Sequence, residues 1–147
     1  MIEIKNISKK FGKLEVLKNV SVSCNSGQCI ALIGPNGCGK TTLIKSILGM
    51  VIPDSGSMEF NQKSIFGDYL YREKIGYMPQ IGRYPDTMTI GEIIEMVKKI
   101  RNSKDNLDED LFRDFEIEKM LNKQMRTLSG GTTQKISAVL AFLFNPD

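Results

Sequence analysis

The chain has 147 residues, of which 41% are hydrophobic and 25% are charged, and its formal net charge is +3. This length predicts one domain, and so small a charge without a dense basic run argues against a nucleic-acid partner. The longest apolar run, residues 138–144, is too short to cross a bilayer, and no apolar signal region stands at the N-terminus, so we expect a cytoplasmic protein.

The first 33 residues have the pattern of short strands separated by turns. A strand begins near Ile2, a turn is predicted at residues 12–13, and residues 20–24 alternate with period two. A second turn is predicted at residues 25–27. The apolar run at residues 29–33 predicts a buried strand.

Residues 34–42 match the phosphate-binding pattern G-x-x-x-x-G-K-[ST] between that strand and a predicted helix at residues 42–48. The glycines allow backbone N–H groups to form an anion-binding nest, and the helix directs its positive end at the same place. Lys40 adds a cation for the β- and γ-phosphates, and Thr41 offers its hydroxyl to Mg²⁺. The candidate phosphate-binding residues are Gly34, Asn36, Gly37, Cys38, Gly39, Lys40, Thr41 and Thr42. The alternative is a glycine-rich turn that precedes a helix.

Further along, residues 53–56 predict a turn and residues 57–60 a short strand. From about residue 86 the pattern becomes helical. Residues 89–92 form a capping-box sequence, and apolar side chains at helical spacing predict one buried face. That face comprises Ile90, Ile93, Ile94, Val97 and Ile100. Residues 105–110 predict the acidic start of a second helix, and we prefer a solvated helix cap there over a metal site.

Residues 128–131, Leu-Ser-Gly-Gly, precede an apolar helical segment at residues 136–144. Ser129 is a good N-cap residue, and the two glycines leave the first N–H groups of the helix uncovered. A second phosphate-binding helix start is therefore predicted at Ser129, Gly130 and Gly131. The alternative is an ordinary transition from loop to helix.

With these two motifs in this order, the whole chain resembles the ATP-binding cassette (ABC) ATPases. The resemblance implies an α/β fold: a P-loop NTPase core with an antiparallel β subdomain and a helical subdomain, truncated at the C-terminus. It divides residues 1–147, as a partial ATP-binding domain, into four parts. These are mainly antiparallel strands with the P-loop strand (1–33), the P-loop core (34–85), the helical subdomain (86–128) and the signature helix (129–147).

The resemblance also implies roles for single residues, with ATP and Mg²⁺ as cofactors. Phe11 resembles the aromatic residue that stacks on adenine; the alternative is a core residue at a strand end. Gln80, the last residue of Tyr77-Met78-Pro79-Gln80, resembles the catalytic glutamine that contacts Mg²⁺ and the attacking water; the alternative is a solvated loop amide. Ser129 and Gly131 would bind the ATP of a second subunit in a head-to-tail dimer. Thr132 departs from the glutamine that usually follows this motif, which puts the contact at position 132 in doubt.

Residues 78–85 and 128–135 resemble most the ATPase subunits of exporters that mature nitrous-oxide reductase. The family also has an Asp-Glu strand end and a switch histidine; this sequence has no histidine, and no such strand follows the signature helix. We therefore expect these residues alone to hydrolyse ATP poorly or not at all. We also expect an exposed apolar sheet edge, with aggregation, a swapped dimer or a rearranged core.

The three cysteines, without a secretion signal, predict reduced thiols. Cys24 and Cys29 are expected to be small core residues, and a metal pair is the less favoured alternative. Cys38 lies inside the P-loop, where bound nucleotide should shield it. Met78, Met88 and Met96 flank a region where a membrane subunit docks in the family; the alternative is an ordinary small core.

The sequence thus predicts the ATP-binding subunit of an ABC membrane transporter. Its expected partners are a transmembrane permease subunit and a second ATPase subunit, and its expected location is the cytoplasmic face of the membrane, reached through the permease. Two alternatives stay open: a non-catalytic nucleotide-binding fragment, and a soluble ABC ATPase that acts on DNA or ribosomes.

Overall fold

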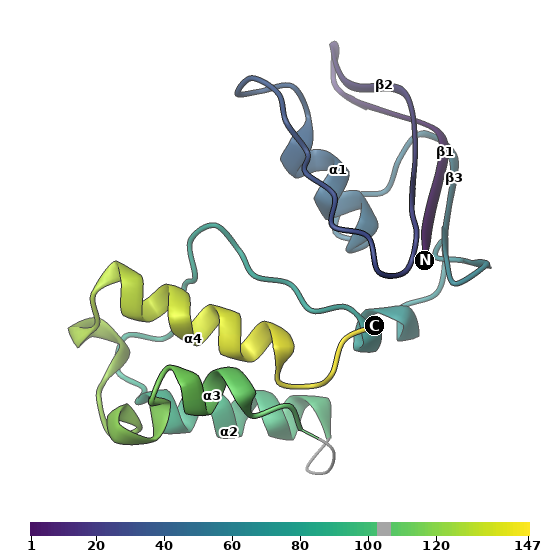
Figure 1. Cartoon of the computed structure of the whole chain (residues 1–147). Coiled ribbons are helices and arrows are strands. Elements are labelled where there is room, and N and C mark those ends of the chain that lie inside the picture. Colours follow the sequence, from purple (N-terminus) through teal and green to yellow (C-terminus); the bar gives the residue numbers. More distant parts are fainter. Residues whose placement is uncertain (103–106) are drawn as a thin grey trace. The chain divides into compact units, whose positions relative to one another are not determined.

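The chain forms two compact units in a computed structural model that describes residues 1–102 and 107–147 (Figure 1). The first unit, Met1–Tyr71, carries an antiparallel sheet and one helix; the second unit, Arg72–Asp147, is helical. Among the described residues, no helix is both long and apolar enough to span a membrane.

Four antiparallel strands form the sheet of the first unit, in the order β2-β1-β3-β4. They are β1 (Ile2–Phe11), β2 (Leu14–Cys24), β3 (Ser55–Phe60) and β4 (Lys63–Ser64). The predicted turn at residues 12–13 joins β1 to β2 as a hairpin. The predicted short strand is confirmed as β3, which pairs with the other edge of β1.

A register shift between Ile4 and Ile7 explains how β1 buries its apolar side chains. Residues three apart would normally face opposite sides of a strand, yet Ile4 and Ile7 are 2% and 0% exposed. Asn6 between them has a φ of 53°, in the left-handed region. The irregularity inserts one residue and returns the next side chain to the core face.

Helix α1 (Lys40–Ile47) packs on this sheet through Leu43 and Ser46, which are buried. The Ser46 hydroxyl donates to the carbonyl of Thr42 over 2.9 Å, which satisfies its buried oxygen within the helix. At the last residue of the helix, the Tyr71 hydroxyl donates to the carbonyl of Ile47 over 2.9 Å. The C-terminal end of α1 is therefore held by a side chain from outside the helix.

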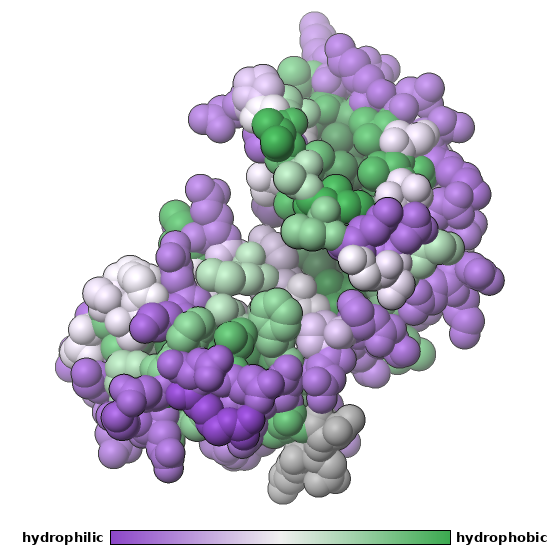
Figure 2. Space-filling view, in the orientation of Figure 1, coloured by the Kyte–Doolittle hydropathy of each residue, from purple (hydrophilic) through white to green (hydrophobic). Residues whose placement is uncertain are grey.

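The prediction of a buried strand at residues 29–33 is wrong. These residues have no regular secondary structure and are exposed, Ile33 to 89%. A buried strand needs neighbouring strands to pair its N–H and C=O groups, and the sheet formed by the described residues does not include this segment. Cys29 is exposed for the same reason, which corrects its placement in the core, whereas Cys24 at the end of β2 is half-buried. Figure 2 shows hydrophobic surface around α1 on the visible face of this unit.

The second unit is built from helices α2 (Ile90–Arg101), α3 (Asp110–Asp114) and α4 (Gly130–Phe142), which lie side by side in Figure 1. Short 3-10 turns η2 (Ile117–Met120) and η3 (Met125–Thr127) connect α3 to α4, and a further one, η1 (Leu70–Lys74), lies at the start of the unit. One hydrophobic cluster fills the centre. Its buried members are Ile90, Ile93, Ile94, Ile117, Met125, Ile136, Val139 and Leu143.

The apolar face of α2 is as predicted except at its last turn. Ile90, Ile93 and Ile94 are buried, but Ile100 is 74% exposed, so its prediction as a core residue is wrong. At 100° per residue, position 100 has turned about 80° away from position 90, whereas position 101 returns to within about 20° of it. Arg101 occupies that place, and its guanidinium lies 5.1 Å from the centre of the Phe144 ring.

The predicted acidic helix begins later than expected. Asp105 and Asn106 lie outside the described residues, and α3 begins at Asp110. In the described part of the chain, no group of three or more His, Cys, Asp or Glu side chains could hold a metal ion. Met88 and Met96 pack against the hydrophobic cluster, while Met78 is 43% exposed.

The capping box at the start of α2 makes the second unit sensitive to acid. The Thr89 backbone N–H and hydroxyl both donate to Glu92 Oε2, over 2.7 and 3.1 Å, and Glu92 N donates back to the Thr89 hydroxyl. The Thr89 N–H, and then its hydroxyl, hold the pKa of Glu92 below its usual range.

Because the folded pKa of Glu92 is lowered, its contribution to stability is present above its usual pKa and is lost as the pH falls through the lowered value. Glu92→Gln should therefore flatten the acid side of a plot of urea midpoint against pH. Glu95→Gln, an exposed position on the same helix, should leave the plot as in the parent. Equal acid sensitivity of Glu92→Gln and the parent would contradict this.

Candidate nucleotide-binding site

The loop before α1 adopts a conformation that only glycine takes without strain at two points. Gly37 and Gly39 have φ values of 82° and 98°, in the left-handed region. A Cβ atom at Gly39 would also lie 2.8 Å from the carbonyl oxygen of Val16. Gly39 is therefore fixed against β2, and the helix begins immediately after it at Lys40.

The Lys40 side chain folds back over this loop. Its Nζ donates to the carbonyl oxygens of Gly34 and Pro35, both over 2.7 Å, and lies 3.8 Å from the Sγ of Cys38. A Cβ atom at Gly34 would come within 2.8 Å of that Sγ. The Lys40 ammonium, the Cys38 thiol and the backbone of Gly34 are therefore in close contact.

The donor set of this loop fits a phosphate chain. The first turn of α1 carries no acidic residue, so nothing there opposes the positive end of the helix. Thr41, the second residue of the helix, is exposed, while Thr42 is half-buried and its carbonyl is used by Ser46. Backbone N–H groups and an ammonium such as that of Lys40 bind phosphate oxygens, and a hydroxyl such as that of Thr41 binds Mg²⁺.

Phe11 lies in the same unit as this loop and is connected to it through the β1–β2 hairpin. It pairs with Leu14 at the end of β1, and β2 then reaches Val16, whose carbonyl contacts Gly39. The side chain is 50% exposed. An exposure of 50% does not fit the alternative of a core residue at a strand end.

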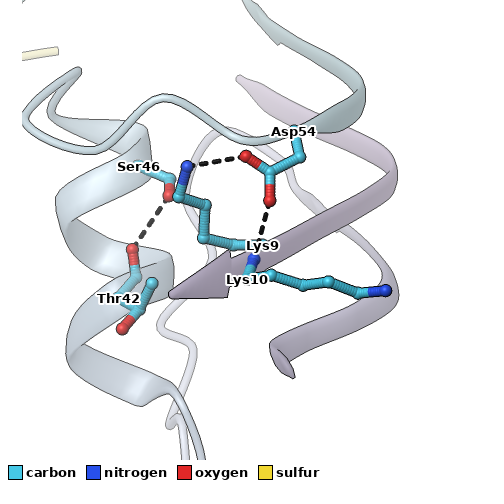
Figure 3. A network of polar contacts seen from close by, with 5 residues as sticks. All are labelled: Lys9, Lys10, Thr42, Ser46 and Asp54. Atoms are coloured by element: carbon cyan, nitrogen blue, oxygen red, sulfur yellow. Dashed lines mark hydrogen bonds and ion pairs between the residues drawn. The ribbon is translucent and has the colours of Figure 1, made fainter. Parts of the chain in front are cut away.

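Two further residues beside Phe11 were missed by sequence reasoning. Lys9 Nζ lies 5.5 Å from the centre of the Phe11 ring and donates to Asp54 Oδ1 over 2.7 Å. Asp54 Oδ2 accepts from the backbone N–H of Lys10, also over 2.7 Å (Figure 3). The Lys9 ammonium first, and then the Lys10 N–H, hold the pKa of Asp54 below its usual range. In the sequence, Asp54 signalled only a turn.

Gln80 is an exposed residue of the second unit. The loop that follows it is anchored on α4, because the Tyr84 hydroxyl and the Ser137 Oγ are 2.8 Å apart. Ser137 is 2% exposed and also donates to the carbonyl of Thr133. This anchor, which the sequence did not signal, ties the loop after Gln80 to the helix that begins at Ser129.

Ser129 is the N-cap of α4, as predicted. Its Oγ accepts from the N–H of Thr132 over 3.2 Å and lies 3.0 Å from the Thr132 hydroxyl. A Cβ atom at Gly130 or Gly131 would meet nothing within 4 Å, so the helix start is open. Thr132, the departure noted in the motif, orients the serine hydroxyl that it neighbours.

The structure therefore gathers Phe11 and the P-loop in the first unit, and places Gln80 and the Ser129 helix start in the second. A glycine loop that wraps a lysine ammonium and leads directly into a helix defines a P-loop nucleotide-binding protein. The model of the ABC transporter family matches residues 17–147, and the chain belongs to that family. The resemblance predicted from the sequence and the α/β class are thereby confirmed.

Known relatives agree with this assignment. The chain is 32% identical to the sulfate/thiosulfate import ATP-binding protein CysA of Pectobacterium atrosepticum, over 99% of this chain and 46% of that protein. It is 34% identical to the zinc import ATP-binding protein ZnuC of Rickettsia conorii, over 100% of this chain and 59% of that protein. A solved structure of the ATP-binding subunit of an ABC transporter matches with a TM-score of 0.87 at 30% identity, over 99% of this chain and 62% of that one. The chain spans about half the length of the curated relatives it matches.

Proposed function

We propose that this protein is the ATP-binding subunit of an ABC membrane transporter and couples ATP binding and hydrolysis to transport. The observation that carries the proposal is the P-loop: Gly37 and Gly39 have left-handed φ values, and the Lys40 ammonium at the start of α1 folds back onto the carbonyls of the same loop. This arrangement presents positive charge and N–H donors to the same small volume, which suits a triphosphate.

In this proposal each predicted residue has one task. Lys40 and the backbone of residues 34–42 bind the β- and γ-phosphates, and Thr41 offers its hydroxyl to Mg²⁺, which when bound neutralises developing phosphate charge. Gln80 is the catalytic glutamine that the resemblance implies. Phe11 stacks on adenine. Ser129, Gly130 and Gly131 bind the ATP of a second subunit in a head-to-tail dimer, and the capped, open start of α4 supports that role.

A transmembrane permease is the proposed membrane partner, which places the protein at the cytoplasmic face of the membrane. The relatives named above are import proteins for sulfate, thiosulfate and zinc. The likeness to nitrous-oxide-reductase exporters stays a prediction.

The proposal is tested by titrating the intact protein with MgATP in a calorimeter and measuring phosphate release in the same samples. Saturable binding with turnover is the expected result, and absence of binding would overturn the proposal. Residues 1–147 alone are expected to bind MgATP with little turnover, as a non-catalytic fragment would. Steady phosphate release by that polypeptide, abolished in Lys40→Met, would contradict this second expectation.

Cys38 gives an independent check on where the nucleotide binds. Because its Sγ lies beside the Lys40 ammonium, MgATP should slow its alkylation by N-ethylmaleimide. Cys29 is also exposed but lies before the loop, so its alkylation should not change and serves as the internal control. Peptide mass spectrometry measures both rates; equal labelling of Cys38 with and without MgATP would place the phosphates elsewhere.

A further inference from the structure

We propose that Lys9 is a positioning residue for the nucleotide base: Asp54 holds its ammonium over one face of the Phe11 ring, and this fixes the ring for stacking on adenine. The inference rests on the proposed function and deepens it, because it concerns how the base is bound. Neither Lys9 nor Asp54 contacts the nucleotide itself in this proposal.

Asp54 holds the end of β1 at three points, and Figure 3 shows the two that its carboxylate makes. One carboxylate oxygen accepts from Lys9 Nζ and the other from the N–H of Lys10, each over 2.7 Å. The N–H of Asp54 donates to the carbonyl of Ser8 over 2.8 Å. The turn after α1 is thus bonded to three consecutive residues that lead directly to Phe11.

The Lys9 side chain is held in one conformation, although lysine side chains are intrinsically flexible. Its side chain is only 17% exposed and ends in a charge-assisted hydrogen bond. The neighbouring Lys10 differs: its side chain is 60% exposed and its Nζ lies 3.7 Å from Glu15. Replacing Lys9 or Lys10 therefore removes the same charge, from a restrained side chain in the first case and from an exposed one in the second.

The Phe11 ring lies in the last pair of the hairpin, opposite Leu14. The Lys9 ammonium lies over one face at 5.5 Å, within cation–π range, and the side chain as a whole is half exposed. A ring held on one face loses less rotational freedom when a base stacks on the other.

The test compares affinities of the intact protein for MgATP and for magnesium tripolyphosphate, which lacks the base. Phe11→Ala should weaken MgATP binding about 10-fold, and Lys9→Met about 3-fold, with tripolyphosphate binding unchanged in both. In the Phe11→Ala background, Lys9→Met should have no further effect. Lys10→Met is the matched control and should bind both ligands as the parent does.

Asp54→Asn provides a second route, because it keeps an acceptor for the Lys10 N–H but loses the charge that holds Lys9. It should reproduce the selective loss of MgATP affinity. Equal loss of tripolyphosphate and MgATP affinity in Lys9→Met, or full MgATP affinity in both Lys9→Met and Asp54→Asn, would overturn the inference. Parent protein that binds tripolyphosphate and ATP equally would overturn the base-stacking role, and the inference with it, but not the proposed function, whereas binding of neither would overturn the proposed function.

Discussion

Lys40→Met should weaken MgATP binding by about 30- to 150-fold, which corresponds to about 2–3 kcal/mol. Lys40 supplies the only full positive charge within residues 34–42, and its hydrogen bonds to phosphate would be charge-assisted. Methionine keeps the apolar stem but cannot donate, so the carbonyls of Gly34 and Pro35 also lose their partner. Isothermal titration calorimetry measures the change directly.

Lys45→Met is the matched control for this variant. Lys45 lies on the same helix and is exposed, so its replacement removes one positive charge without touching the loop. It should bind MgATP within about 2-fold of the parent, because the exposed Lys45 side chain lies in the last turn of the helix, whereas the phosphate-binding loop lies at its start. Similar losses in the two variants would mean that net charge, and not the loop, governs binding.

Ile93→Ala should lower the free energy of unfolding of the second unit by about 3 kcal/mol. Ile93 is 0% exposed and belongs to the hydrophobic cluster that joins α2 to α4. Truncation removes apolar contacts and leaves a cavity that the surrounding helices can only partly fill. Urea denaturation followed by circular dichroism measures the loss.

The same substitution at Ile100 tests whether the loss of stability depends on the burial of the isoleucine side chain. Ile100 is on the same helix but is 74% exposed, so Ile100→Ala should change the free energy of unfolding by less than about 0.5 kcal/mol. A loss at Ile100 equal to that at Ile93 would show that the last turn of α2 packs against the protein in solution.

Local sequence signals predicted the local features of this fold well. The capping box at Thr89 and the N-cap at Ser129 depend on hydrogen bonds between residues three apart in the sequence, and the P-loop depends on glycines within one short segment, at positions 34, 37 and 39. The prediction of a buried strand at residues 29–33 failed because a run of hydrophobic side chains does not specify which strands will pair with it. The prediction that Ile100 is buried failed because Ile100 stands in the last turn of α2, and helical periodicity does not show how far along the helix its packing partners extend.

The polar anchors could not be predicted, because they join residues that are far apart in the sequence. Asp54 and Lys9 are 45 positions apart, and Tyr84 and Ser137 are 53 apart. An aspartate in a Pro-Asp-Ser-Gly turn and a serine in a helix interior are common residues with common local explanations. Only the tertiary structure shows that each completes a hydrogen bond beside a predicted functional residue.

The two ends of the second unit meet. The N–H of Asp147 donates to the carbonyl of Lys74 over 2.9 Å, and the Asp147 carboxylate lies 3.2 Å from the Lys74 ammonium. A segment whose entry and exit are adjacent can be exchanged between homologues at those two joints with little cost in loop closure. Chimaeras that swap residues 74–147 would keep one protein's P-loop while taking another's helical unit, and so separate nucleotide binding from the contacts that the helical unit makes.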